Sequence, residues 1–248
     1  MSNKTRSTFI YLQAALQIII TFLLFAIFTL FVLLLTIVSF GLLKNKIIEH
    51  FGRLLGRLVL LLYRVPMQII QTDKLSNSPA IYISNHSSTL DMFIILGLGL
   101  KNIRFVAKHE LRYNPFFFLM GTATGQVFVK RNKSKETIDS MQKALNKIKQ
   151  KKLSIFIAPE GTRKHSDRIG RFKKGAFHMA LDLNYPIIPI FIQGAREACP
   201  NDSLVVKPGK ITVYFHEPID VRFWKTETLD QHISEVRQKY CAWDKKYS

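Results

Sequence analysis

Several motifs that define common enzyme classes are missing from this chain of 248 residues. It has no G-x-S-x-G segment for a serine nucleophile, no H-E-x-x-H segment for zinc and no G-x-x-x-x-G-K-S/T loop for a nucleotide. The glycine-containing segment at residues 97–102 lacks the third glycine of a dinucleotide-binding turn. No aromatic RNA-binding motif or helix-turn-helix pattern indicates a nucleic-acid partner. These absences narrow the chemistry that the chain can carry out.

Cysteine and acidic residues are also scarce. Cys199 and Cys241 are too few for a disulfide framework, and neither lies in a metal-ligand spacing. We interpret both as reduced thiols and expect no metal site. Lys and Arg number 36 against 17 Asp and Glu, a formal net charge of +19. Such a basic excess predicts an anionic partner: nucleic acid, membrane phosphates or a phosphorylated substrate.

Charge is absent from one long segment. From Ser7 to Leu43 the chain carries no charged residue over 37 positions. As one helix this segment would be about 55 Å long, against a hydrocarbon core of about 30 Å. We therefore predict a membrane segment that tilts, breaks, or turns back as a helical hairpin near Thr21 or Gly41. A cleavable signal peptide is excluded, because its apolar region is shorter, about 7–15 residues.

Basic residues are more numerous after this segment than before it, so the positive-inside rule places the following domain on the cytoplasmic side, at the inner membrane if the source is bacterial. Three arginines recur among leucines in residues 51–65 at roughly helical spacing. They predict an amphipathic helix in the membrane interface, near lipid phosphates. A second buried helix is the alternative. We divide the chain into an N-terminal membrane anchor, residues 1–65, and a basic domain, residues 66–248.

Short β-rich apolar runs alternate with helical patterns in the basic domain. The predicted strands are residues 80–84, 103–107, 126–129, 153–158, 187–193 and 210–215, and the predicted helices are residues 89–99, 134–150 and 173–184. This alternation predicts an α/β fold with a mixed, mostly parallel sheet flanked by helices. Ligands of such folds usually bind beyond the carboxyl ends of the strands.

The segment ISNHSSTLDMF, residues 83–93, follows one predicted strand and holds a histidine and an aspartate. If the helix begins near Ser88, His86 lies in the loop before it and can fold back toward Asp91. An aspartate on one imidazole nitrogen fixes the tautomer and leaves the other nitrogen as a base. Ser88 and Asp91 also fit an S-x-x-D capping box. On this segment alone both interpretations stay open.

Two further polar clusters follow strands. APEGTR, residues 158–163, combines a carboxylate, a glycine, a hydroxyl and a guanidinium, which suits phosphate but is also typical of a polar surface turn. VKR, residues 129–131, is either a phosphate contact or a solvated face. Lys173 and Lys174 precede a predicted helix start, which suits an anion. A base without a protein nucleophile or a metal suggests a substrate hydroxyl as the nucleophile, deprotonated by His86.

These clusters resemble the blocks of the glycerolipid acyltransferase family, most closely the 1-acyl-glycerol-3-phosphate acyltransferases. The first block, N-H-x-x-x-x-D, is matched by Asn85, His86 and Asp91; the second, near G-x-x-F-x-x-R, by Gly125, Phe128 and Arg131; the third, F-P-E-G-T-R-S, by Pro159, Glu160, Gly161, Thr162 and Arg163; and the fourth, a proline-bearing strand, by Pro186 and Pro189. The order holds across about residues 66–220. Ala158 and Lys164 depart from the usual aromatic and serine.

The resemblance implies that His86 takes the proton from the free hydroxyl of a lysophospholipid as the oxygen attacks an acyl thioester, with Asp91 orienting the imidazole. Backbone N–H groups near Gly161 are candidate donors to the oxyanion. The implied phosphate ligands are Arg131, Arg163 and Lys130, and the implied supporting acceptor site is Glu160, Gly161 and Thr162.

The resemblance further implies acyl-CoA or acyl carrier protein as co-substrate, with no cofactor and no metal. It implies a bilayer with anionic lipids as a partner, and no nucleic acid. Two alternatives stay open. One is the same chemistry on another acceptor: glycerol 3-phosphate, another lysophospholipid or a lyso-amino-lipid. The other is a non-catalytic membrane module that binds anionic lipid.

Overall fold

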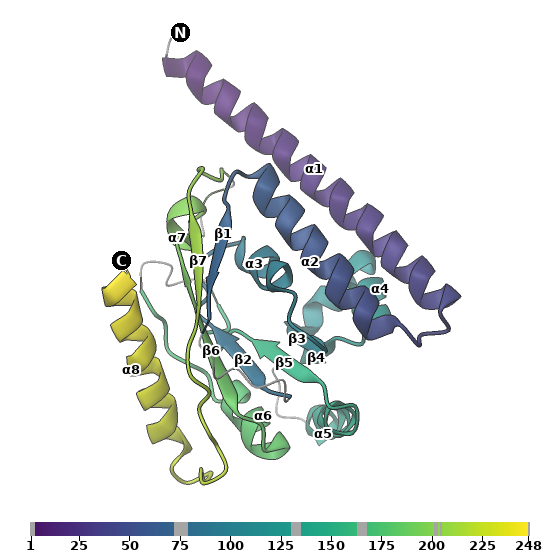
Figure 1. Ribbon diagram of the computed structural model, residues 1–248, viewed down its shortest axis with the longest axis vertical. Coiled ribbons are helices and arrows are strands. Elements are labelled where there is room, and N and C mark those ends of the chain that lie inside the picture. Colours follow the sequence, from purple (N-terminus) through teal and green to yellow (C-terminus); the bar gives the residue numbers. More distant parts are fainter. Residues whose placement is uncertain are drawn as a thin grey trace.

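The computed structural model describes residues 3–71, 79–129, 135–162, 168–200, 203 and 205–247. Its centre is a seven-stranded sheet in the order β1-β7-β6-β2-β5-β3-β4 (Figure 1). The strands are β1 (Met67–Ile70), β2 (Ile81–Ser84), β3 (Ile103–Lys108), β4 (Val127–Val129), β5 (Ser154–Ile157), β6 (Ile187–Gln193) and β7 (Ile211–Phe215). Neighbouring strands are parallel except β6 and β7, which are antiparallel. The predicted mixed, mostly parallel α/β fold is confirmed.

Helices cover both faces of the sheet. They are α1 (Asn3–Val38), α2 (Lys44–Leu62), α3 (Asp91–Leu98), α4 (Pro115–Thr124), α5 (Lys135–Gln150), α6 (Gly175–Leu183), α7 (Ala195–Ala198) and α8 (Leu229–Tyr247), with the short helix η1 (His109–Tyr113). One apolar cluster joins the sheet to α5, α6 and α8, and a second joins it to α2 and α3. Because both faces are covered, the central strands are apolar throughout: β6 is buried at six successive positions.

The uncharged N-terminal segment forms one unbroken helix followed by a turn. α1 continues through Thr21 to Val38, and the chain reverses over residues 39–43, where Gly41 has a φ of 74°. The predicted hairpin therefore turns near Gly41 and not at Thr21. α1 and α2 lie side by side (Figure 1), and the side-chain amide of Gln17 donates to the Leu62 carbonyl at 3.1 Å.

α1 is long and apolar enough to cross a membrane. The candidate span is Thr8–Val38, 31 residues with a mean hydropathy of 3.1, and only 17% of its most apolar window is buried. A core helix of a soluble protein would bury most of this surface. These properties indicate membrane association, as the sequence predicted.

α2 packs closely on α3. A Cβ on Gly56 would lie 2.4 Å from both the Gly97 nitrogen and the Phe93 oxygen, so only glycine permits this approach. Arg57 donates through Nε to the Gly97 carbonyl at 3.2 Å, close to the end of α3. The predicted helix is thus present, and one side of it, with Leu55, Val59 and Leu60, is buried within the protein. Leu54 and Leu61 are exposed, and the interfacial position of this helix stays a prediction.

All six predicted strands and all three predicted helices of the basic domain are present within a few residues of their expected bounds. β1 was not predicted, because the edge strand MQII has only four residues and follows a proline. α4 and α8 were also not predicted. α8 carries many charged side chains, and its apolar residues indicate a helix only when the sheet face against which they pack is known.

Candidate active site

The candidate site begins where β2 ends, in the middle of the sheet between β5 and β6. Asn85, the first residue after β2, is 3% exposed. Its side-chain amide donates to the Ile192 carbonyl at 2.9 Å and accepts from the Ile192 N–H at 2.8 Å. The amide thus bonds to β6 as another strand residue would. This pairing fixes the backbone immediately before His86.

His86 and Asp91 form the predicted pair. His86 Nδ1 lies 2.8 Å from Asp91 Oδ2, and the same oxygen accepts the N–H groups of Ser87 at 2.9 Å and Ser88 at 3.1 Å. The side chain of Asp91 is 4% exposed and that of His86 is 29% exposed. Because an ionised carboxylate only accepts, Nδ1 carries the hydrogen and Nε2 is the acceptor. Among the described residues no side chain or backbone group bonds to Nε2.

The groups of the predicted capping box bond to each other in the same loop, although α3 begins at Asp91 and its N-cap residue, Leu90, has no side-chain cap hydrogen bond. Ser88 Oγ accepts the Leu90 N–H at 3.1 Å and donates to the Cys199 carbonyl at 2.8 Å. Asp91 accepts the Ser88 N–H, as the carboxylate of a capping box does. The start of α3 and the orientation of the imidazole therefore depend on one carboxylate. The two interpretations of the segment are compatible.

Glu160 connects this loop to the loop that follows β5. Its carboxylate accepts the His86 N–H at 2.9 Å through Oε1 and the Gly170 N–H at 2.7 Å through Oε2. Glu160 is 4% exposed, and burial raises the pKa of its carboxyl, while the two N–H donors act in the opposite direction. A Cβ on Gly170 would lie 2.7 Å from Oε2, so a side chain there would displace the carboxylate. Glu160 fixes the backbone of His86 and leaves the imidazole free.

The C-terminal helix supports the loop after β5 and the two strands β2 and β6. On α8, Arg237 donates to the Gly170 carbonyl at 2.8 Å and to the Ile169 carbonyl at 2.9 Å. The fully buried Tyr240 hydroxyl lies 2.9 Å from the Ile83 carbonyl and 3.2 Å from the Ile190 carbonyl. Arg237 therefore holds the loop whose N–H group binds Glu160. Sequence reasoning missed both residues, because nothing local distinguishes them from ordinary side chains of a charged helix.

We expect Arg237→Ala to lower kcat roughly tenfold, because two charge-assisted hydrogen bonds that position the Gly170 loop are lost. KM for the acceptor should change little, and Arg237→Lys should recover part of kcat. Steady-state kinetics on protein shown to be folded by its thermal midpoint measure both parameters. Arg222→Ala is the matched control, since Arg222 is exposed and bonds to Asp220. An unchanged kcat in Arg237→Ala would remove the positioning role.

The remaining predicted residues are either on the loop after β5 that the structure describes or outside the described residues. Gly161 has a φ of 63° and its N–H donates to the Ala158 carbonyl at 3.1 Å, so this N–H is already used within the turn and is not an available oxyanion donor. Thr162 follows it, half-buried, on the same loop as Glu160. The three predicted phosphate ligands lie outside the described residues: Lys130, Arg131 and Arg163.

The two lysines before α6 differ in their surroundings. Lys174 forms an exposed ion pair with Asp230, with Nζ 2.7 Å from Oδ2. The Lys173 side chain lies over Gly161, where a Cβ would approach its Nζ to 3.0 Å. The structure thus brings His86, Asp91, Glu160 and a cationic side chain together at neighbouring loops. The arrangement provides a base with a fixed tautomer next to a positively charged loop.

Comparison with known proteins identifies the family of this chain. The Acyltransferase family model matches residues 66–193. A protein of Limnanthes alba named 1-acyl-sn-glycerol-3-phosphate acyltransferase is 32% identical over 227 residues, covering 87% of this chain and 80% of its own length. A protein of the same name from Escherichia coli (strain K12) is 29% identical over 205 residues, covering 81% and 83%.

The fold also matches a solved structure. The crystal structure of the 1-acyl-sn-glycerophosphate acyltransferase PlsC from Thermotoga maritima aligns with a TM-score of 0.65 and 23% sequence identity, covering 92% of this chain and 98% of that one. At this identity the match concerns the fold, including its N-terminal helical part. The matched family segment ends at Gln193, so α8 with Arg237 and Tyr240 lies beyond it.

Proposed function

This chain belongs to the acyltransferase family, and we propose that it transfers a fatty acyl group from an acyl thioester to the free hydroxyl of 1-acyl-glycerol-3-phosphate, giving phosphatidic acid. The names of its relatives support the acceptor. The observation that carries the proposal is the His86–Asp91 pair, in which Nδ1 is held at 2.8 Å and Nε2 has no bond to any described residue. An imidazole in this state can accept a proton from a hydroxyl.

In the proposed reaction His86 Nε2 removes the proton of the acceptor hydroxyl as its oxygen attacks the thioester carbonyl. A new C–O bond forms and a tetrahedral oxyanion results. Collapse of this intermediate breaks the C–S bond, and the leaving thiolate recovers the proton from the imidazolium. The buried Asp91 carboxylate stabilises the imidazolium between these two steps. No acyl-enzyme intermediate and no cofactor are needed.

The remaining roles are proposed from the charge of the side chains and from the family motifs that they match. Arg131, Arg163 and Lys130 hold the acceptor phosphate, and the loop with Glu160, Gly161 and Thr162 forms one wall of the acceptor site. Planar guanidinium groups suit a phosphate because they bind two of its oxygens at once. The donor is acyl-CoA or acyl carrier protein.

The acceptor and the product are both lipids, which explains the apolar α1. A membrane-associated enzyme can take its substrate from the bilayer without releasing it to water. The excess of basic residues after α1 favours a cytoplasmic position for the α/β domain, at the inner membrane if the source is bacterial. Its positive charge attracts anionic lipids to this surface.

A panel of acceptors and donors tests the proposal. We expect purified full-length protein to show a kcat/KM for 1-acyl-glycerol-3-phosphate at least about tenfold above that for a lysophospholipid whose phosphate is esterified to a head group, because charge-assisted hydrogen bonds contribute about 1.5–3 kcal/mol each. The panel includes glycerol 3-phosphate and a lyso-amino-lipid, each with acyl-CoA and with acyl carrier protein. A faster reaction with one of these acceptors would reassign the substrate. No turnover of any pair would support a lipid-binding module instead.

A further inference from the structure

The buried guanidinium of Arg104 lies at the amino end of β3, whereas His86 follows the carboxyl end of β2. Arg104, the second residue of β3, is 4% exposed. Its Nη1 donates to the Ile103 carbonyl at 2.7 Å and its Nη2 donates to the Asn45 side chain of α2. Both acceptors are neutral, and among the described residues no carboxylate forms an ion pair with Arg104. A buried cation without a counter-charge favours the binding of an anion.

The third nitrogen of Arg104, Nε, lies near a second cation beside Gly125. Gly125, the residue after α4, is exposed and carries no side chain. The position that a Cβ would occupy there is 3.6 Å from Arg104 Nε and 3.5 Å from Lys44 Nζ. Neither nitrogen has an acceptor among the described residues. Two cationic donors from different elements therefore converge on one accessible point.

Further positive charge surrounds this point. Lys147, in the last turn of α5, and Lys151, just after the helix, are exposed and act on Lys44 by repulsion. Partial burial, together with Arg104 and these lysines, lowers the pKa of Lys44. An anion at the point would screen the mutual repulsion of all four cations. The cluster thus has the composition of an anion site.

This cluster is separate from the candidate active site. Arg104 and Gly125 lie at the amino ends of β3 and β4, whereas His86 follows the carboxyl end of the parallel strand β2. A strand of the length of β3 spans about 20 Å. A phosphate held over Gly125 is therefore not the phosphate of an acceptor that reacts at His86.

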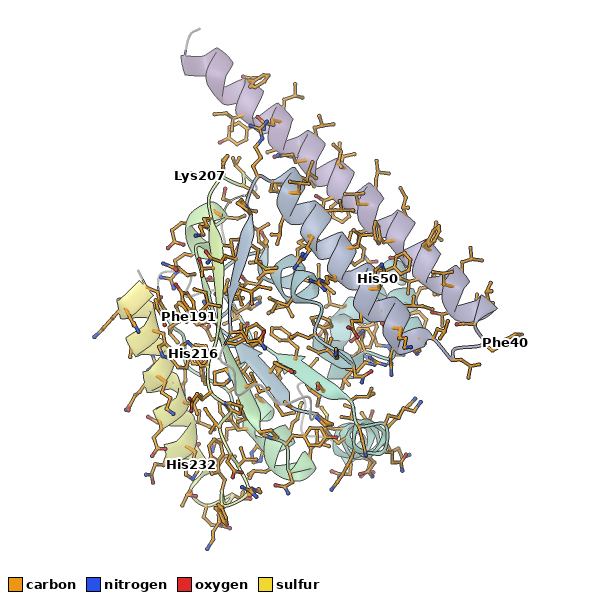
Figure 2. The ribbon with its side chains drawn as sticks, viewed as in Figure 1. Phe40, His50, Phe191, Lys207, His216 and His232 are labelled. Carbon is orange, nitrogen blue, oxygen red and sulfur yellow. The ribbon has the colours of Figure 1, made fainter. Side chains whose placement is uncertain are left out.

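The residues directly before Lys44 are strongly apolar and exposed. Phe40 is 92% exposed and Leu42 is 86% exposed, in the turn between α1 and α2. Phe40 projects away from the body of the protein at the tip of this turn (Figure 2). In a membrane-associated chain these side chains suit the hydrocarbon, and a lysine two positions beyond Leu42 suits the level of the lipid phosphates. This neighbourhood favours a lipid phosphate over a soluble one.

We propose that Lys44 and Arg104 bind the phosphate of an anionic membrane lipid over Gly125, at a site distinct from the active site. The lipid fixes the α1–α2 turn against β3 and α4, since Lys44 begins α2 and Arg104 bonds to Asn45 of the same helix. The site therefore links membrane contact to the packing of the α/β domain.

Thermal unfolding of the full-length protein in neutral detergent tests the site. Titration with short-chain phosphatidylglycerol should raise the unfolding midpoint of the wild type by about 5–10 °C at about 100 times its Kd. Short-chain phosphatidylcholine and inorganic phosphate should have much smaller effects. Lys44→Glu should abolish the shift, because its carboxylate takes the place of the anion beside Arg104. Lys239→Glu, on exposed α8, is the charge-matched control and should keep the shift.

The outcomes separate the proposal from its competitors. An equal shift by phosphatidylglycerol in Lys44→Glu would overturn it, because the lipid would then bind elsewhere, as at the active site. Equal shifts by phosphatidylcholine, or by inorganic phosphate, would overturn the assignment to an anionic lipid. Should Lys44→Glu not fold, Lys44→Gln provides the same comparison, with a reduced shift expected and an unchanged one contradicting the site.

Discussion

Replacement of His86 by alanine is expected to lower kcat for acyl transfer by about 10²- to 10⁴-fold, the usual contribution of a general base. The backbone of residue 86 should stay in place, because Glu160 accepts its N–H group and not its side chain. KM for the acceptor should therefore change little. Initial rates with the preferred acceptor and donor measure both constants.

His50→Ala is a matched control for this variant. His50 is exposed on α2, and its ring packs against Phe51. We expect its kcat to stay near that of the wild type. If His86→Ala kept more than about a tenth of the wild-type rate, a general base at this position would be excluded.

Asp91→Asn is expected to lower kcat by a similar factor, about 10²- to 10⁴-fold, for a different reason. An asparagine oxygen can still accept the N–H groups of Ser87 and Ser88. Its uncharged amide no longer requires a hydrogen on His86 Nδ1, and it stabilises the imidazolium less. The wrong tautomer presents a donor, and not an acceptor, to the substrate hydroxyl. The measurement is again kcat, compared at pH values where wild-type activity is constant.

The double variant His86→Ala/Asp91→Asn distinguishes a shared role from a structural one. If Asp91 acts only through the imidazole, the double variant should be no slower than His86→Ala alone. Independent losses that multiply would contradict this coupling. The thermal midpoint of Asp91→Asn should fall only modestly, because the loop keeps two of its three hydrogen bonds to residue 91. Complete loss of folding would assign Asp91 a mainly structural role.

The loop that carries His86 and the apolar helix α1 are held by different elements, but packing contacts connect α1 to the helix that carries Asp91. His86 is fixed by β6, by the loop after β5 and, through Gly170, by α8. α1 contacts α2, which in turn packs on α3, the helix that begins at Asp91. One continuous set of contacts therefore joins the apolar helix to the helix that carries the aspartate.

The sequence by itself determined the class of fold and the central pair of residues. Alternation of apolar runs predicted six of the seven strands, because the side-chain periods of strands and helices are local properties. The spacing of His86 and Asp91 across a helix start was likewise local, and the structure joins them at 2.8 Å. The uncharged run from Ser7 to Leu43 was enough to predict a membrane segment.

Tertiary structure alone decided which partners support that pair. Gly170 and Arg237 lie far from His86 in the chain, and they reach it only through Glu160 and a loop carbonyl. The burial of Arg104 and its convergence with Lys44 over Gly125 likewise depend on elements separated in sequence. Such contacts leave no periodic or local signal, because they depend on where the folded elements pack and not on the residues beside them.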